Sequence, residues 1–322
     1  MVRRLFTVFI PMRTELVILI LILFFPVCFL EGQTLEVKHS EHFSIFYPPR
    51  HRYSVELLQS EGEGHLRRVA ADLGIDPAVL TPKISVYILT RREDFALVEK
   101  GYSLSPDWSA GFVDIYNNVI VIKSASLESP SAKGVVTIFC HELTHLLVKA
   151  YLGDRYFALP YWFHEGIAMR EAREWSLSDA FYLVRKGMLG SLIPLERLTS
   201  SFPDEQGEVH LAYLESLNFI IHLEERFGEG FIPRLLTEIK EVGAFELSFF
   251  ALTREHWQEV EGQWRQALEY HYRWIPWITS TSTIWMIGVI LIIIGYLKKR
   301  RRQREVIKRW EEEDFSLKNR NN

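Results

Sequence analysis

The sequence predicts an α+β fold with one membrane-spanning helix near its C-terminus. Three observations lead to this prediction. Short segments with alternating apolar residues, typical of strands, occur before residue 125. Longer apolar segments that suit helices follow over residues 135–270. A last apolar run, residues 275–297, is long enough to cross a bilayer.

The N-terminal segment, residues 1–32, has the character of an export signal. Arg3, Arg4 and Arg13 precede the apolar run 16–30, which is typical of a secretory signal peptide or a short N-terminal anchor. Gly32 is the best candidate for the residue before a cleavage site. Cleaved and retained forms both stay open, and in either case we expect the following polypeptide to be exported.

The next segments predict strands with helices between them. Residues 35–48 predict one or two strands, in which Phe43, Ile45 and Tyr47 alternate with polar residues. Two helices and one further strand follow from the same patterns: a helix over 53–73 closed by Gly74, a strand over 83–89, and a short helix from Thr90 to near Gly101.

Residues 111–124 predict a hairpin. It turns at Asn117 and Asn118, because both residue types tolerate positive φ. We expect its second arm, residues 119–123, to be an edge strand near the following helix, where an extended peptide could pair with it. A plain structural hairpin explains the pattern equally well.

The next segment contains the pattern His-Glu-x-x-His. Residues 135–152 read VVTIFCHELTHLLVKAYL, without Pro or Gly, and predict a buried helix. His141 and His145 are one turn apart on one face of that helix, and Glu142 lies about 100° around it. Two imidazoles that bind one metal ion, with a glutamate beside them, are the signature of zinc hydrolases.

Two solvent-facing histidines on an ordinary amphipathic helix would give the same pattern. The flanking residues argue against this alternative, because they leave no polar face: Ile138, Phe139, Leu143, Leu146, Leu147 and Val148. Buried polar groups without partners cost several kcal/mol, of order 2–7. A metal ion would supply the missing partner.

A second helix is predicted to bring the third ligand. Residues 159–173 read LPYWFHEGIAMREAR, and Pro160 suits a helix start. Glu165 follows within aromatic and apolar neighbours, where a carboxylate needs a counter-charge or a cation. A salt bridge to Arg170 or Arg173 is the alternative to metal binding. We expect the adjacent His164 to point elsewhere, as an outer or surface residue.

The two segments together resemble the gluzincin metallopeptidases, in particular the peptidase-MA-like domains. HELTHLL is followed by LPYWFHEGIA, in which Trp162, Glu165, Gly166 and Ala168 match the pattern Trp-x-x-Glu-Gly-x-Ala. The resemblance extends more loosely over most of residues 33–240. It implies a zincin-like domain, in which a small mixed sheet lies over the active-site helix and the C-terminal part is helical.

The resemblance also implies the roles of individual residues. It implies Zn²⁺ held by His141, His145 and Glu165, with Glu142 as general base. Thermolysin-like relatives carry an acidic residue four positions after the ligand glutamate, to hold a zinc-bound histidine, and this chain has Met169 there. Glu171 and Asp179 are the candidates that remain for this contact.

Tyr213 is a candidate donor to the oxyanion of a tetrahedral intermediate. It lies in an Ala-Tyr-x-x-Ser segment, which the resembling families share, on a helix predicted over 210–227. His210 is a rival for this role, and a plain core position for Tyr213 is equally compatible with the pattern. Helices over 231–241 and 255–270 are expected only to pack, with these core candidates: Leu235, Leu236, Trp257, Val260 and Trp264.

The C-terminal apolar run predicts a transmembrane helix over 274–297. Trp274, Trp277 and Trp285 lie toward one end and Tyr296 toward the other, as in an aromatic belt. Five basic residues follow at 298–302, which predicts a cytoplasmic tail over 298–322. The body, residues 33–273, is then extracytoplasmic, which means periplasmic or on the cell surface in a bacterium.

Composition excludes several classes. The net charge is −4, and the basic tail leaves the body more acidic still, which argues against a nucleic-acid partner. The chain has only two cysteines, too few for a disulfide framework.

Taken together, the motifs and the predicted membrane span lead us to expect a membrane-anchored zinc metallopeptidase that cleaves a peptide or protein. The alternatives are a catalytically silent binding module in the cell envelope and an intramembrane metalloprotease.

Overall fold

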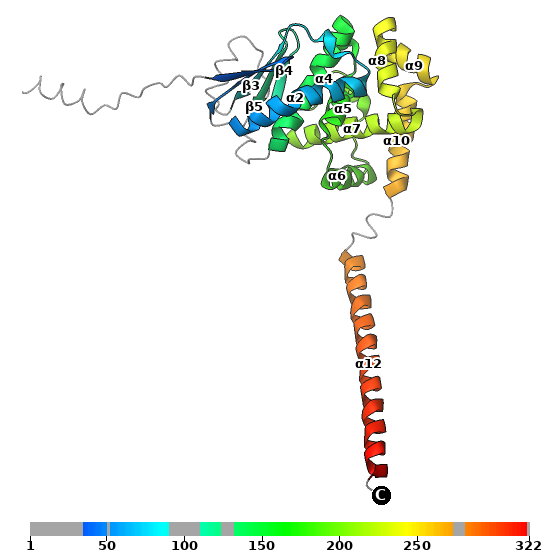
Figure 1. Cartoon of the computed structure of the whole chain (residues 1–322). Coiled ribbons are helices and arrows are strands. Elements are labelled where there is room, and N and C mark those ends of the chain that lie inside the picture. The colour runs from blue at the N-terminus through cyan, green and yellow to red at the C-terminus, as the bar shows by residue number, and fades with distance from the viewer. Residues whose placement is uncertain (1–34, 50–51, 90–109, 124–131, 273–280, 321–322) are drawn as a thin grey trace, which may run out of the picture.

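A small sheet forms one side of the body, and helices pack against it (Figure 1). The computed structural model describes residues 35–49, 52–89, 110–123, 132–272 and 281–320. The predicted export signal over 1–32 and the short helix predicted over 90–101 lie outside these residues. Most of the described chain is helical, and the α+β prediction is confirmed.

The sheet is mixed and has the order β1-β2-β3-β5-β4. Neighbours β2, β3 and β5 run parallel, whereas β1 and β4 run antiparallel to the strands that they flank. Its strands have these bounds: β1 Glu36–His39, β2 Phe43–Tyr47, β3 Ile84–Leu89, β4 Gly111–Asp114 and β5 Val119–Lys123. Phe43, Ile45 and Tyr47 are buried and their neighbours are half-buried, as the alternation predicts.

The predicted hairpin is present, but its edge strand is the other arm. β5 lies between β3 and β4, and all five of its residues are buried. A strand buried on both faces carries a continuous apolar run, and VIVIK has almost no polar alternation. β4 is therefore the outer strand at this end of the described sheet. The turn contains Asn118 at φ +52°.

The helices have these bounds: α2 Arg52–Leu73, α4 Ala132–Leu152, α5 Tyr161–Ala172, α6 Leu177–Met188, α7 Gln206–Phe227, α8 Phe231–Val242, α9 Phe245–Thr253, α10 Trp257–Tyr272 and α12 Thr281–Arg320. Short 3₁₀ turns connect them: η2 Pro77–Val79, η4 Gly153–Ala158 and η5 Leu195–Leu198. The sequence patterns did not predict α6 or α9. α6 begins at a capping box formed by Ser176 and Asp179.

α4 is the central helix of the body. It packs against α2, α5, β4 and β5, which explains why its sequence is apolar all round. Within the described residues, Gly134–Ala158 is long and apolar enough to span a membrane, yet 67% of its apolar window is buried in the body. A core position accounts for this composition and disfavours an intramembrane protease.

α5 packs against α7 at very short range. A Cβ on Gly166 would lie 2.7 Å from the Ser216 carbonyl oxygen and 2.7 Å from Ile220 Cγ1, so only glycine fits. One turn earlier, Trp162 is fully buried and its ring packs against those of Phe219, Phe245 and Trp257. These contacts fix α5 against α7, α9 and α10. All five predicted core residues of the C-terminal helices are buried.

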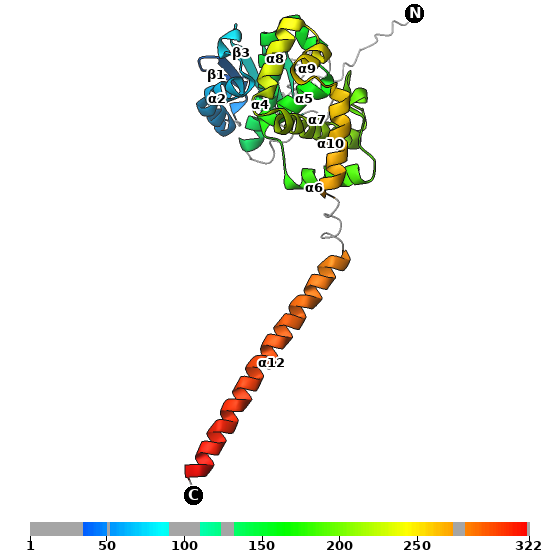
Figure 2. The ribbon, with the colours of Figure 1, turned by 90° about the vertical axis from the view of Figure 1, so that its right-hand side faces the viewer.

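α12 stands apart from the body in both views (Figures 1 and 2). Its apolar side chains are exposed along the segment from Trp285 to Leu297. The beginning of the predicted membrane span, up to residue 280, lies outside the described residues. The span therefore stays a prediction.

We expect Gly166→Ala to lower the free energy of unfolding by about 1–3 kcal/mol, because the added methyl group meets backbone atoms of α7. Thermal unfolding of the variant would measure this change. Gly64→Ala in α2 is the matched control: its Cβ meets nothing within 4 Å, and alanine favours a helix by up to about 1 kcal/mol. Equal melting temperatures for Gly166→Ala and the parent would contradict the close packing.

Candidate metal centre

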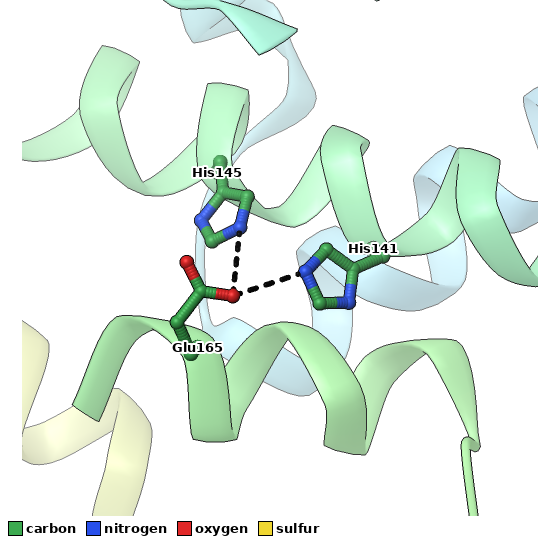
Figure 3. Close-up of side chains that lie close together, drawn as sticks. All are labelled: His141, His145 and Glu165. Atoms are coloured by element: carbon green, nitrogen blue, oxygen red, sulfur yellow. Dashed lines mark hydrogen bonds and ion pairs between the residues drawn. The ribbon is translucent and has the colours of Figure 1, made fainter. Parts of the chain in front are cut away.

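Three predicted ligands meet where α4 faces α5. Figure 3 shows His141 and His145 on one helix and Glu165 on the facing helix. Glu165 Oε2 lies 3.2 Å from His141 Nε2 and 3.7 Å from His145 Nε2. One ligand atom from each residue lies within 4.8 Å of the others, and the group is buried. The structure therefore brings together the three side chains that the motifs indicate.

Glu165 does not form the alternative salt bridge. Arg170 Nε instead donates to Glu224 Oε2 at 2.7 Å, and its guanidinium also contacts Glu171. Arg173 ends α5 in a left-handed conformation. Among the described residues, the partners of the Glu165 carboxylate are the histidines and Tyr161.

The donor set fits a catalytic zinc ion. Two imidazole nitrogens and one carboxylate oxygen are the usual protein ligands of such a site. Both histidines direct Nε2 toward Glu165, and each Nδ1 has a neighbour of its own. The Tyr156 hydroxyl lies 3.3 Å from Nδ1 of His145, and Glu174 Oε1 lies 3.6 Å from Nδ1 of His141. Such outer contacts orient a ligating imidazole and select its tautomer.

Glu174 takes the place that we expected for Glu171 or Asp179. The buried Glu171 carboxylate pairs with Arg68 and Arg170. The other predicted candidate, Asp179, caps α6, and its Oδ1 lies 3.4 Å from His210 Nε2. Both predictions were wrong, because the Glu171 carboxylate pairs with arginines and the Asp179 carboxylate with His210, and neither pairs with His141.

The chain turn after α5 explains how Glu174 reaches α4. Arg173 has φ +58°, and its backbone N–H bonds back to Arg170 O. The N–H of Glu174 bonds to Met169 O at 3.1 Å, which completes a Schellman turn. Glycine usually occupies the left-handed position, and arginine stands here. The sequence therefore carries no signal for the reversal.

Burial and mutual contacts set the charges in the group. Burial raises the pKa of Glu165, but His145 and the hydrogen bond with His141 outweigh burial and lower the pKa to about 2. Burial lowers the pKa of His145 to about 3. Burial also lowers the pKa of His141, whereas contacts with Glu165 and Glu174 raise it well above 6.5. An ionised Glu165 and a neutral His145 are ready to ligate, and His141 must release a proton to do so.

Glu142 lies beside the group and faces a cavity of about 870 Å³. Burial raises its pKa to about 7, although nearby His141 opposes the rise. β4 passes close by: a Cβ on Gly111 would lie 3.1 Å from Glu142 Oε1 and 2.6 Å from Ile138 Cγ2. Glycine at this position lets the outer strand approach the carboxylate.

Aromatic residues form much of the cavity wall. Tyr156, Tyr161 and Tyr213 all line it, and the Tyr213 ring lies 6.3 Å from the ring of His141. His210 is exposed, lies with Asp179 and Tyr182, and is not among the residues that line the cavity. The geometry therefore favours Tyr213 over His210 as a group that can reach a substrate.

Sequence reasoning missed three residues of this site and misplaced a fourth. Tyr156, Tyr161 and Glu174 had no motif to identify them. His164 was expected to point elsewhere, yet it is half-buried and lines the cavity, with its ring 5.3 Å from that of His145. The aromatic run YWFH before Glu165 was the only available signal, because a histidine in apolar company rarely faces solvent.

A second group of possible ligands carries less weight. Glu41, His42 and Glu63 also lie close together, but Glu41 is exposed. The Glu63 carboxylate already accepts hydrogen bonds from the Ser40 hydroxyl and from the backbone N–H of His42, and its Oε2 lies 2.8 Å from His42 Nδ1. These contacts explain the group as a link between α2 and the turn before β2.

Individual known proteins match this chain at low sequence identity, and each match covers only part of the known protein. The curated protein YhcO of Bacillus subtilis (strain 168), itself described as uncharacterized, is 26% identical over 113 residues, which are 34% of this chain and 33% of YhcO. Two structures of native leukotriene A4 hydrolase from yeast, Saccharomyces cerevisiae, match with TM-scores of 0.43 and 0.44 at 11% and 10% identity. These matches cover 76% and 73% of this chain, and 38% and 39% of the hydrolase.

The chain thus spans about a third of YhcO and less than two fifths of the yeast enzyme. A family comparison reaches further. The family model of the Peptidase MA superfamily matches residues 63–270, about two thirds of the chain. The matched range contains both histidines, Glu142, Glu165, Glu174 and Tyr213. The chain therefore belongs to the Peptidase MA superfamily.

Proposed function

We propose that this protein is a membrane-anchored, zinc-dependent metallopeptidase of the gluzincin type. The observation that carries the proposal is the buried meeting of His141, His145 and Glu165, with Glu142 beside them on the wall of one open cavity. Membership of a peptidase superfamily supports peptide or protein as the substrate class.

Each side chain has a definite task in this proposal. His141, His145 and Glu165 would hold Zn²⁺, which would act as a Lewis acid that lowers the pKa of water and polarises the scissile carbonyl. Glu142 takes a proton from the attacking water and delivers it to the leaving nitrogen. Tyr213 donates a hydrogen bond to the developing oxyanion. Burial raises the pKa of the Tyr213 hydroxyl, which keeps its proton available for this bond.

β4 supports an extended peptide as the substrate. It is the outer strand at its end of the described sheet, and it lines the cavity through Gly111, Phe112 and Val113. A peptide that pairs with the edge of a sheet gains backbone hydrogen bonds and places alternate side chains in pockets. A chain running along β4 would pass Glu142, because Gly111 lies against that carboxylate.

α12 supports attachment to a membrane. Soluble proteins rarely expose a helix whose side chains are almost all apolar. α12 exposes such a segment from Trp285 to Leu297. Basic residues 298–302 follow immediately, which favours a cytoplasmic tail and an extracytoplasmic body. The location outside the cytoplasm is part of the proposal.

A catalytically silent binding module is the second candidate. It would use the same fold to hold a partner in the cell envelope. The presence of Glu142, which is not needed to hold a metal, favours the enzyme. Zinc content, together with cleavage of an unfolded protein in the presence and absence of a chelator, separates the two candidates.

We expect Glu142→Gln to retain zinc and to lower kcat by about 10²–10⁴-fold, because the general base is lost. Cleavage of an unfolded protein substrate measures the rate, and elemental analysis measures the metal. Glu208→Gln, at an exposed position on α7, is the control and should cleave as the parent does. Turnover by Glu142→Gln at the parental rate would reject the assigned base.

Glu165→Ala should lower zinc occupancy, because only two protein ligands remain. Metal content per chain after dialysis at limiting free zinc is the measurement. An unchanged content would show that Glu165 is not a ligand.

We expect Glu174→Gln to weaken zinc binding by about 10–100-fold, because the outer carboxylate no longer orients His141. Competition with a chromogenic chelator gives the zinc affinity without a need for activity. Asp179→Asn is the matched control, since that carboxylate faces His210 and α6 instead. If both variants bind zinc as the parent does, the role assigned to Glu174 is wrong.

A further inference from the structure

α6 presents an apolar stripe to solvent. Successive residues of a helix are about 100° apart, so Leu177, Phe181 and Met188 lie within roughly 40° of one another. Their side chains are 80%, 50% and 39% exposed. The body covers the adjoining side of the helix, where Leu183 and Gly187 are buried, and it also covers Val184 at the border of the stripe. Leu177, Phe181 and Met188 nevertheless stay exposed to solvent.

The surroundings of the stripe are those of an interfacial helix. Trp175 and Leu189 flank α6 and are 38% and 69% exposed. Arg185 is exposed beside the stripe, about 40° from Phe181, whereas Lys186 is half-buried and lies nearly opposite the stripe. Helices that lie in a membrane surface combine aromatic and aliphatic residues on one side with basic residues at its border. Tryptophan in particular favours the level of the headgroups.

The position of α6 supplies the second argument. α6 packs against α10, and both views place α6 at the same end of the body as the C-terminal end of α10 (Figures 1 and 2). In sequence, only residues 273–280 separate α10 from α12. Eight residues span at most about 29 Å when fully extended. A membrane that holds α12 is therefore close to this end of the body.

We propose that α6 rests on the surface of the bilayer that holds α12, with Leu177, Phe181 and Met188 inserted among the lipids and Arg185 on anionic headgroups. The inference depends on the membrane anchor of the proposed function and adds a second contact to it. Two contacts fix the orientation of the body on the membrane, which a single attachment does not do.

α9 offers a matched control surface. Leu247 and Phe250 are 65% and 39% exposed, as apolar as the α6 stripe. In both views α9 lies at the opposite end of the body from α6 (Figures 1 and 2). Exposure alone would treat the two surfaces alike, whereas proximity to the anchor selects α6.

Spin labels on the full chain test the proposal. The chain, with Cys28→Ser and with buried Cys140 retained, is reconstituted into bilayers of phosphatidylcholine and phosphatidylglycerol. A nitroxide is attached in turn through Phe181→Cys, Leu247→Cys and Met286→Cys. Collision rates with oxygen, which enters lipid, and with a water-soluble nickel complex give the depth of each label.

We expect the label at 181 to be shielded from nickel and accessible to oxygen, at about 5–10 Å into the interface. The label at 247 should stay accessible to nickel, and the label at 286, within α12, should be the deepest. A label at 181 that nickel reaches as easily as it reaches 247 would overturn the contact of α6, even if 286 lies in lipid. A label at 181 that both reagents fail to reach would also overturn it, because protein would then cover the stripe. If nickel reaches the label at 286, α12 does not lie in the bilayer, and both the membrane anchor and the proposed contact of α6 are overturned.

Discussion

The burial of His141, His145 and Glu165 between α4 and α5 is the constraint on which the rest of the structure depends. Three ionisable groups in an apolar interior cost several kcal/mol unless they meet each other or a cation. Glu165 Oε2 lies within 3.7 Å of Nε2 of both histidines. In this arrangement of the two helices, the three polar groups are partners of one another.

Packing remote from the group holds that arrangement. Gly166 brings α5 against the backbone of α7, and Trp162 fixes α5 in an aromatic cluster with α7, α9 and α10. Glu165 lies between Trp162 and Gly166 in the sequence, and its carboxylate faces the two histidines. The pattern Trp-x-x-Glu-Gly therefore combines one functional carboxylate with the two packing residues that aim it, which explains why the three occur together.

The cavity is assembled from segments that are far apart in the chain. β4, α4, α5, α7 and residues 199–204 each contribute to its wall. Glu142 and the outer strand β4 approach closely because Gly111 has no side chain. If α6 rests on the bilayer, the same body is held at two points, and the orientation of this cavity on the membrane is fixed with it.

Several features followed from the sequence alone, because they depend on local spacing: the central helix with His141, Glu142 and His145 on it, the helix that carries Glu165, the strand alternation and the superfamily. The tertiary structure decided the rest. β5 became an inner strand because β3 pairs with it, which left β4 at the edge. Glu174 reaches His141 through a left-handed Arg173, and Tyr156 reaches His145 from η4. Such contacts depend on how the chain turns between helices and strands, and the residue patterns of this sequence do not predict those turns.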